Sequence, residues 1–264
     1  MLNRQALLKT VSEPEERLLF AKVLDQADLS ARKYEPVFTD FMDMAKSSKF
    51  LESVRRHYHL NCGAFGGYAD CERRMLGFVP DYMEIAEAAF PIRILKITMN
   101  KKFGQKDLSH RDYLGSILGL GIDRGKVGDI ILLEDKTICY VQEDMADYIC
   151  TNLESVSRTK VEVTLLESTE LILPEKNIEY KNLTVSSLRL DAVVGAAFHL
   201  ARGKAQDLIH GEKVNVNWTL VTSASSLVKE GDMISLRGEG RVKLTEVQGR
   251  TKKDRLSIVI GKYV

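Results

Sequence analysis

Hydrophobic residues recur at helical spacing along the first third of the chain. Ser12–Glu15 supplies a capping serine, an early proline and an acidic residue, which together favour the start of a helix. The apolar residues of Leu18–Leu24 continue that helix on one face. A second helix is predicted from near Thr39 to His57. Residues 1–80 are therefore expected to form a helical N-terminal region.

The middle of the chain has a different pattern, in which short apolar runs alternate with helical segments. The predicted order is strand, helix, strand, strand, helix and strand, over Ile92–Met99, Ser109–Leu118, Asp129–Leu133, Thr137–Val141, Glu143–Leu153 and Val161–Leu166. This β-α-β-β-α-β order is that of a ferredoxin-like sandwich, which RNA-recognition motifs (RRMs) share. The two central strands lack the interleaved aromatic residues on which RNA bases stack in such motifs. Residues 81–170 are therefore expected to form an RRM-like domain without the usual RNA-reading surface.

Two short helices and a set of strands are predicted at the C-terminal end. A polar stretch with one proline, residues 171–184, indicates a linker, and residues 185–264 are expected to form the last domain. Its elements are an apolar helix from about Leu188, a second helix that ends at Gly211, a strand over Val214–Trp218, and two apolar strands joined by the basic turn Gly249–Arg255. Together the three regions predict an α+β fold.

The composition is that of a soluble globular protein, with 44% hydrophobic and 28% charged residues among 264. No apolar run approaches the roughly 20 residues that cross a bilayer, and the N-terminus lacks the pattern of a signal peptide. A cytoplasmic location without membrane insertion is therefore expected. The four cysteines form no Cys-x-x-Cys pair, and their spacing from His57 and His59 matches no common zinc site, so neither a metal nor a cofactor is expected.

Charge is distributed unevenly along the chain. From Lys181 to Val264 there are 14 Lys and Arg against 8 Asp and Glu, a net charge of +6, whereas the whole chain carries +1. Residues 1–180 therefore carry −5. A basic end of this size is typical of a surface that binds a polyanion, although an ordinary solvated basic face would look the same.

The densest motif upstream runs from His110 to Ile130. His110 and Asp112 could form an acid–base pair, and the glycines could cradle a phosphate, but this glycine run follows a helix and opens a strand, the reverse of a phosphate-binding loop. The glycines could instead form a tight structural turn. In a third interpretation the basic residues of this region contact RNA phosphates, with Arg111, Arg124, Lys126 and, more weakly, Arg73 as the candidates.

The stretch from Ser186 to Gly240 resembles the S4 module, a small fold that presents basic residues to structured RNA. The resemblance rests on Leu188–Asp191, an apolar helix, Ala201–Lys204 and the later Gly231-Asp232 turn. Ala201 stands where the S4 pattern usually has serine, which removes an N-cap hydroxyl at a cost of about 1 kcal/mol. The basic residues expected on this surface are Arg189, Arg202, Lys204, Lys213, Arg237 and Arg241.

The motifs together resemble the YlmH family of bacterial S4-domain proteins. The resemblance rests on Thr39–Phe41, Gly66–Tyr68, Glu72–Arg74, the His110–Ile130 run and Gly249–Arg255 after the S4-like stretch. It implies a helical N-terminal part, an RRM-like domain and an S4 domain. It also implies binding to rRNA and tRNA on the large ribosomal subunit, in the rescue of stalled peptidyl-tRNA complexes, without catalysis.

Two other functions remain open at this point. The acidic N-terminal region could bind protein partners, as an adaptor associated with cell division would. Alternatively, the S4-like end could be the accessory module of an RNA-modifying enzyme, since Arg189-Leu190-Asp191 superficially matches the catalytic motif of pseudouridine synthases. Asp191 is followed by Ala-Val-Val within a predicted helix, so it is interpreted as a charge that favours the helix N-terminus.

Overall fold

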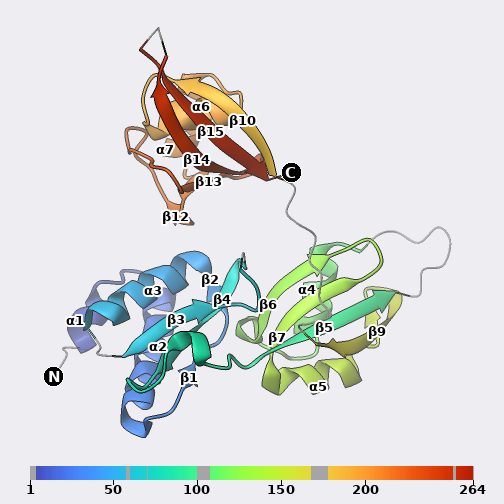
Figure 1. The fold of residues 1–264 in the computed structure, drawn as a ribbon. Coiled ribbons are helices and arrows are strands. Elements are labelled where there is room, and N and C mark those ends of the chain that lie inside the picture. The colour runs from blue at the N-terminus through green and yellow to red at the C-terminus, as the bar shows by residue number, and fades with distance from the viewer. Residues whose placement is uncertain are drawn as a thin grey trace. The chain divides into compact units, whose positions relative to one another are not determined.

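The computed structural model describes residues 4–57, 60–69, 71–99, 108–167, 178–251 and 254–263. The chain divides into two compact units, Met1–Ile172 and Leu173–Val264, which are described one at a time (Figure 1).

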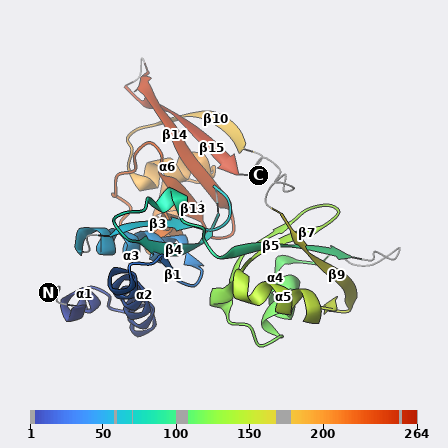
Figure 2. The same cartoon turned by 60° about the horizontal axis from the view of Figure 1, so that its bottom comes forward.

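The first unit begins with helices packed against a small sheet. The helices are α1 (Arg4–Lys9), α2 (Pro14–Lys33) and α3 (Met44–His57), and the strands are β1 (Val37–Phe38), β2 (Met42–Asp43), β3 (Asn61–Phe65) and β4 (Arg73–Val79). Strand β4 pairs antiparallel with each of the other three strands. Helices α2 and α3 both contact β4 (Figure 2). The core between them includes the stacked rings of Phe20 and Phe50.

The helical N-terminal region is confirmed, but it also contains this sheet, which the hydrophobic pattern does not predict. Pro14 takes the first position of α2, as expected, but the N-cap residue is Glu13 rather than the predicted Ser12, and it makes no side-chain cap. The second helix begins at Met44 rather than near Thr39, because residues 39–41 connect β1 to β2 and Met42–Asp43 form β2. Thr39 holds that connection against β4, since its hydroxyl accepts a hydrogen bond from the backbone N–H of Leu76 at 2.9 Å.

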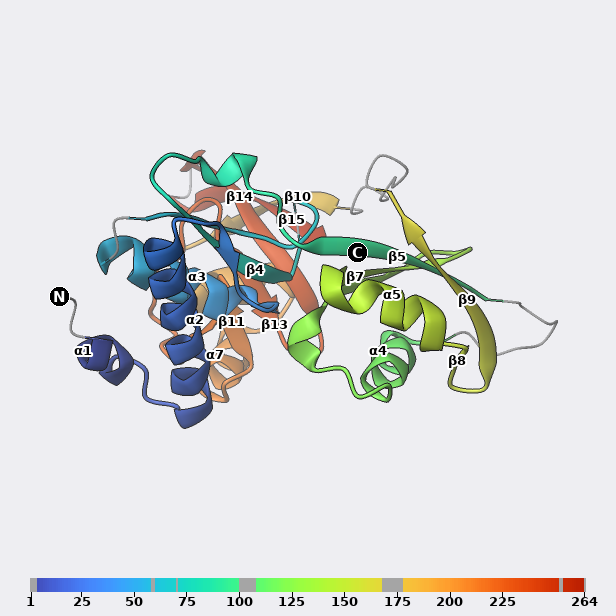
Figure 3. The ribbon, with the colours of Figure 1, turned by 90° about the horizontal axis from the view of Figure 1, so that it is seen from below.

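The RRM-like domain follows in the same unit. Its elements are β5 (Ile92–Met99), α4 (His110–Leu118), β6 (Val127–Leu132), β7 (Thr137–Gln142), α5 (Glu143–Asn152), β8 (Ser155–Val156) and β9 (Thr159–Leu166). The antiparallel sheet has the order β6-β7-β5-β9-β8, and the predicted β-α-β-β-α-β sequence of elements is confirmed. Ser109 caps α4 in a reciprocal pair with Asp112. Helices α4 and α5 cover one face of the sheet (Figure 3).

Part of the other face of this sheet packs against the N-terminal part of the unit, through Tyr68. Ile94, Ile138 and Tyr140 point to this face, because side chains alternate between the faces of a strand. The ring of Tyr68 stacks on Tyr140 with 5.1 Å between the ring centroids. Gly67 allows this close approach, since its φ is +103° and a Cβ there would lie 2.3 Å from the Tyr140 ring. The aromatic residue of the central strand is therefore occupied within the protein.

A buried carboxylate joins the N-terminal part to the RRM-like domain. Asp129 on β6 is 9% exposed, and it accepts hydrogen bonds from the Tyr68 hydroxyl at 2.7 Å and from the backbone N–H groups of Glu72 at 2.7 Å and Arg73 at 3.0 Å. A second bond between the two parts runs from the N–H of Phe41 to the carbonyl of Gly125 at 2.7 Å. These contacts tie the start of β6 to the start of β4.

The C-terminal unit is one sheet with two helices packed on it. Its strands are β10 (Ile178–Val185), β11 (Val214–Val216), β12 (Thr219–Leu220), β13 (Met233–Leu236), β14 (Gly240–Arg250) and β15 (Leu256–Tyr263), and its helices are α6 (Leu190–Ala197) and α7 (Arg202–His210). The sheet order is β10-β15-β14-β13-β11-β12, and both helices contribute to the same apolar core. The hairpin expected around Gly249–Arg255 is confirmed as the β14–β15 pair.

Two expectations for this unit are corrected. Residues 178–184, expected in the linker, form β10 together with Val185, because all eight residues of Ile178–Val185 pair in register with β15. Trp218 was expected at the end of a strand, but it lies with Asn217 in the turn between β11 and β12, where both have positive φ. The side-chain amide of Asn217 holds that turn by donating to Asp232 at 2.8 Å.

We predict that Asp129→Asn lowers the free energy of unfolding of the first unit by about 2–3 kcal/mol. The amide keeps the shape of the side chain but loses the charge that strengthens three hydrogen bonds in a buried site. Denaturant unfolding of the full chain, followed by hydrogen exchange in β4 and β6, measures the effect. The matched control is Asp135→Asn, whose side chain is 77% exposed and which we expect to change stability by less than about 0.5 kcal/mol. Equal effects of the two substitutions would contradict the role of Asp129.

Candidate nucleic-acid interface

Two arginines of the C-terminal unit are held by one buried carboxylate. Asp191, in the first turn of α6, has a fully buried side chain. Arg189 donates to it through Nε at 3.2 Å and Nη2 at 3.1 Å, and Arg202 does so through Nε at 3.1 Å and Nη2 at 3.3 Å. Gln206 on α7 adds a hydrogen bond of 2.7 Å. The carboxylate therefore fixes both guanidinium groups and connects α6 to α7.

The hydrogen bonds to Asp191 determine its ionisation. Burial alone would raise the pKa of Asp191, but the hydrogen bonds from Arg189, Arg202 and Gln206 outweigh it and hold the pKa well below its usual range. The hydrogen bonds that Arg189 donates to Asp191 also raise the pKa of Arg189. Asp191 is thus ionised at neutral pH, and the side chains of Arg189 and Arg202 keep 37% and 52% of their surface exposed. Each can contact a phosphate while Asp191 holds it in place.

The start of α7 adds to this basic surface. Lys204 is exposed on the first turn of α7, two residues after Arg202. Ala201 is the N-cap residue of α7 and makes no side-chain cap. This helix end therefore lacks the hydroxyl that a serine, the usual S4 residue here, would supply. The first backbone N–H groups of a helix favour negative charge, so Arg202 and Lys204 lie at an end that already attracts phosphate.

A small cavity of about 240 Å³ adjoins the Asp191 cluster. Arg202 and Arg255 line it, together with Asp191 and the end of β10. The exposed Arg255 donates through Nη2 to the carbonyl of Thr184 at 2.6 Å, which holds its guanidinium at the rim. The cavity therefore has two fixed guanidinium groups, one from α7 and one from the β14–β15 hairpin.

The remaining S4 candidates lie at other places of the unit. Lys213 and Arg237 are both exposed, and a backbone hydrogen bond of 2.9 Å from Arg237 to Lys213 places them side by side. Lys213 follows the C-terminal end of α7, and that end lies roughly 12 Å along the helix axis from Arg202. Arg241 is half-buried on β14, with its guanidinium 6.0 Å from the centre of the Tyr263 ring. The S4 candidates thus form separate groups rather than one cluster.

The candidates of the first unit differ in how free they are to bind RNA. Arg111 is exposed on the first turn of α4. Arg124 donates to the carbonyls of Val127 and Gly128. Lys126 pairs with Asp40 and Asp144, each at 3.2 Å. Burial alone would lower the pKa of Lys126, but the two carboxylates outweigh it and raise the pKa.

Arg73 is the most constrained candidate of the first unit. Its guanidinium donates to the carbonyls of Val127 at 3.0 Å, Phe41 at 3.0 Å and Arg124 at 3.3 Å. Burial lowers its pKa to about 10, so the side chain still carries its charge at neutral pH. These bonds favour a structural role for Arg73 at the junction of the N-terminal part and the RRM-like domain.

The acid–base interpretation of the middle motif gains no support from the geometry. The carboxylate of Asp112 accepts hydrogen bonds from the backbone N–H of Ser109 at 2.8 Å and from its hydroxyl at 2.6 Å, which makes it part of the helix cap. His110 is exposed. Within the described part of the chain, no three His, Cys, Asp or Glu side chains come together as a metal site would require. No helix among the described residues has the length and apolarity needed to cross a membrane.

The role of Asp191 was not predicted from the sequence, and Gln206 and Arg255 were not among the candidate residues. Asp191 was interpreted only as a helix N-terminal charge. A signal was nevertheless present, because a lone carboxylate on an otherwise apolar helix is rarely buried unless it is paired. The partners themselves, Arg202 and Gln206, lie 11 and 15 residues away, and only the fold brings them together.

Comparison with known proteins gives three family matches along the chain. Residues 15–83 match a family described as "YlmH, N-terminal", residues 86–170 match "Putative RNA-binding domain in YlmH", and residues 188–234 match the S4 domain. The last of these includes Arg189, Asp191 and Arg202.

Two proteins resemble the chain over much of its length. It is 33% identical over 241 residues to "Ribosome-associated protein quality control protein P2" of Bacillus subtilis (strain 168), which covers 91% of this chain and 93% of that protein. The solved structure of "Cell division protein ylmH from Streptococcus pneumoniae" shares the fold, with a TM-score of 0.52, 22% identity, and coverage of 61% of this chain and 97% of that one. The chain therefore belongs to the YlmH family, with its N-terminal, RNA-binding and S4 domains.

Proposed function

We propose that this chain binds rRNA and tRNA on the large ribosomal subunit and acts, without catalysis, in the rescue of stalled peptidyl-tRNA complexes. The observation that carries the proposal is the pair of exposed arginines fixed on buried Asp191 in the S4 domain. The name of the Bacillus subtilis relative, a ribosome-associated quality control protein, supports the ribosome as the partner.

The physical basis of the proposal is preorganised phosphate binding. Free arginine side chains lose rotamer entropy when they bind, whereas Arg189 and Arg202 are already oriented by Asp191. A guanidinium can also bind two phosphate oxygens at once, and neutralising phosphates releases counterions. In this proposal Lys204, Lys213, Arg237 and Arg241 extend the contact within the S4 domain, and Arg111 is the candidate of the RRM-like domain with the most exposed position.

We predict that the double substitution Arg202→Ala and Lys204→Ala weakens binding to purified large ribosomal subunits by about tenfold or more. Each lost phosphate contact should also lower the slope of log K against log salt by about 1. Asp191 keeps Arg189 and Gln206 as partners, so the domain should stay folded. Co-sedimentation of the full chain with large subunits, with and without peptidyl-tRNA, over a range of salt concentrations measures both effects.

The matched control for this experiment is Lys181→Ala. Lys181 is exposed on β10 and pairs with Glu179 at 3.2 Å, so its removal changes the net charge without touching the Asp191 cluster. Unchanged binding of the double variant would reject the S4 surface. Failure of the unsubstituted chain to bind large subunits at all would reject the ribosome as its partner.

A second prediction separates a fixed pair of arginines from general positive charge. Asp191→Asn makes the protein more positive by one charge, so a surface that acts only by net charge would bind RNA more tightly. We predict weaker binding, because the neutral amide no longer holds both guanidinium groups in place. The same co-sedimentation assay tests this, with circular dichroism and thermal melting to establish that the variant is folded. Tighter binding by a folded variant would refute the role of Asp191.

A further inference from the structure

A cavity of about 480 Å³ lies at the edge of the N-terminal sheet in the first unit. Strand β3 forms this edge, because Gly77 and Phe78 of β4 pair with β3 on one side and with β1 on the other. Residues of β3 line the cavity together with Arg55 of α3 and with the short 3₁₀ helix η1 (Ile85–Glu87) and the segment after it. The cavity is therefore a slot along β3, with α3 on one wall and η1 on the other.

The edge of β3 presents free backbone groups to this slot at Ala64. On β4, both the N–H and the carbonyl of Leu76 bond to Thr39, on the β1 side. Successive residues of an antiparallel strand point their backbone groups to opposite sides, so the β4–β3 bonds run between Gly77 and Gly63. Ala64 therefore directs its N–H and carbonyl away from β4. No hydrogen bond outside the sheet joins these two groups to another described residue.

The η1 wall of the slot is apolar. Phe65 is 41% exposed, and its ring lies 5.6 Å from the ring of Phe90 between centroids. Ile85 packs directly on Gly63, where a Cβ would come within 2.8 Å of the Ile85 side chain. An apolar side chain placed in the slot would remove the Phe65 ring from water, which is favourable.

The α3 wall of the slot carries a positive charge. Arg55 lies in the last turn of α3, is exposed, and donates to the carbonyl of Cys62 at 3.1 Å, which holds it beside β3. Among the described residues that line the slot it is the only charged one, and no ion pair joins it to another of them. Glu84 and Glu87, at η1, form a capping box with the backbone of η1 and would repel an acidic group on that side. The slot therefore suits one carboxylate on the α3 side.

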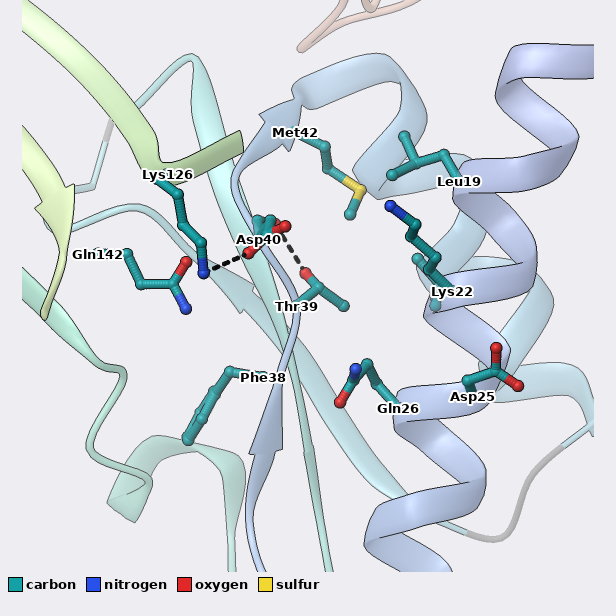
Figure 4. Close-up of a pocket in the computed structure, with 11 residues that line it drawn as sticks. Leu19, Lys22, Asp25, Gln26, Phe38, Thr39, Asp40, Met42, Lys126 and Gln142 are labelled. Carbon is teal, nitrogen blue, oxygen red and sulfur yellow. Dashed lines mark hydrogen bonds and ion pairs between the residues drawn. The ribbon is translucent and has the colours of Figure 1, made fainter. Parts of the chain in front are cut away.

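Another cavity of the first unit, of about 290 Å³, has a different charge (Figure 4). It lies between α2, the β1–β2 segment and the end of β7. Lys126 and Asp40 pair there at 3.2 Å, and Lys22 and Asp25 complete its charged lining. Its charges sum to zero, whereas the slot beside β3 keeps one positive charge.

We propose that the slot binds an extended segment of a partner protein, which adds to the sheet beside β3. The segment bonds through its backbone to the N–H and carbonyl of Ala64, an acidic side chain meets Arg55, and a neighbouring apolar side chain covers Phe65. Neighbouring side chains of a strand point to opposite faces, so they reach the two walls. In such strand addition the backbone bonds give affinity and the side-chain contacts give specificity. This protein contact goes beyond RNA binding and does not involve the S4 surface.

A short peptide added to the full chain tests the slot directly. The probe is acetyl-Ser-Val-Thr-Val-Asp-Val-Ser-amide, which in an extended conformation places its valines on one face and its carboxylate on the other. We expect a saturable change in the chemical shift of the Ala64 amide in an NMR titration, with a dissociation constant below about 1 mM. The same peptide with lysine in place of aspartate should bind about fivefold more weakly.

Two substitutions test the assigned contacts. Arg55→Glu should reverse the preference, so that the lysine peptide binds more tightly than the aspartate peptide. The matched control is Arg56→Glu, which makes the same change of charge at an exposed residue of the same helix turn and should keep the preference. Ala64→Pro should abolish binding with little change in melting temperature, because the lost N–H faces the slot rather than β4. The Arg55→Glu reversal decides the question even where Ala64→Pro does not fold.

The opposite results are equally clear. No saturable shift of the Ala64 amide up to about 5 mM peptide, or an unchanged preference in Arg55→Glu, would overturn the proposal. Slow hydrogen exchange of the Ala64 amide in the free chain would show that the edge is already covered, by the chain itself or, where the exchange becomes faster on dilution, by a second copy. Either would overturn a partner protein as the occupant. The double variant Arg202→Ala and Lys204→Ala should bind the peptide normally, so this site and the ribosomal function can fail separately.

Discussion

The cost of burying a carboxylate organises the basic surface of the S4 domain, which we propose binds RNA. Asp191 is fully buried, so its charge must be met by donors from the protein. Arg189, Arg202 and Gln206 meet it, and in doing so they fix the angle between α6 and α7 and the direction of two guanidinium groups. The same interaction therefore supports the fold of the S4 domain and prepares it to bind phosphate. A hydrophobic residue at position 191 could fill the space but could not orient the arginines.

In the first unit a second buried carboxylate likewise gathers hydrogen-bond donors, and there it joins two folded parts. Asp129 draws a tyrosine hydroxyl and two backbone N–H groups onto the start of β6. Arg73 adds hydrogen bonds to carbonyls on both sides of the same junction. The glycine-rich run before β6 and the start of β6 thus contact residues of three motifs, Thr39–Phe41, Gly66–Tyr68 and Glu72–Arg74. These motifs join two folded parts of the unit, and this structural role explains them without a catalytic one.

The sequence predicts most of what depends on local spacing and little of what depends on long-range contact. The strand Ile92–Met99 and the Ser109 cap are confirmed because periodicity and capping act within a few residues. The N-terminal sheet escapes prediction because β1 and β2 are each two residues long, too short to show alternation. Arg73 and Lys126 look like basic surface residues in the sequence, and only the fold reveals their hydrogen bonds and ion pairs.

The contact between Tyr68 and Tyr140 limits how the sheet of the first unit can contact RNA. In RRMs, bases stack on aromatic residues of the central strands. Here Tyr140 on the central strand β7 is stacked against Tyr68, and Ile94 and Ile138 lie beside it in the same apolar cluster. Exposing this face would require separating Tyr68 from Asp129 and Tyr140, with the loss of a hydrogen bond to a buried charge. Contacts from the edges of the unit, such as through the exposed Arg111 on α4, require no such separation. The first unit is therefore better suited to bind RNA at its margins than across its sheet.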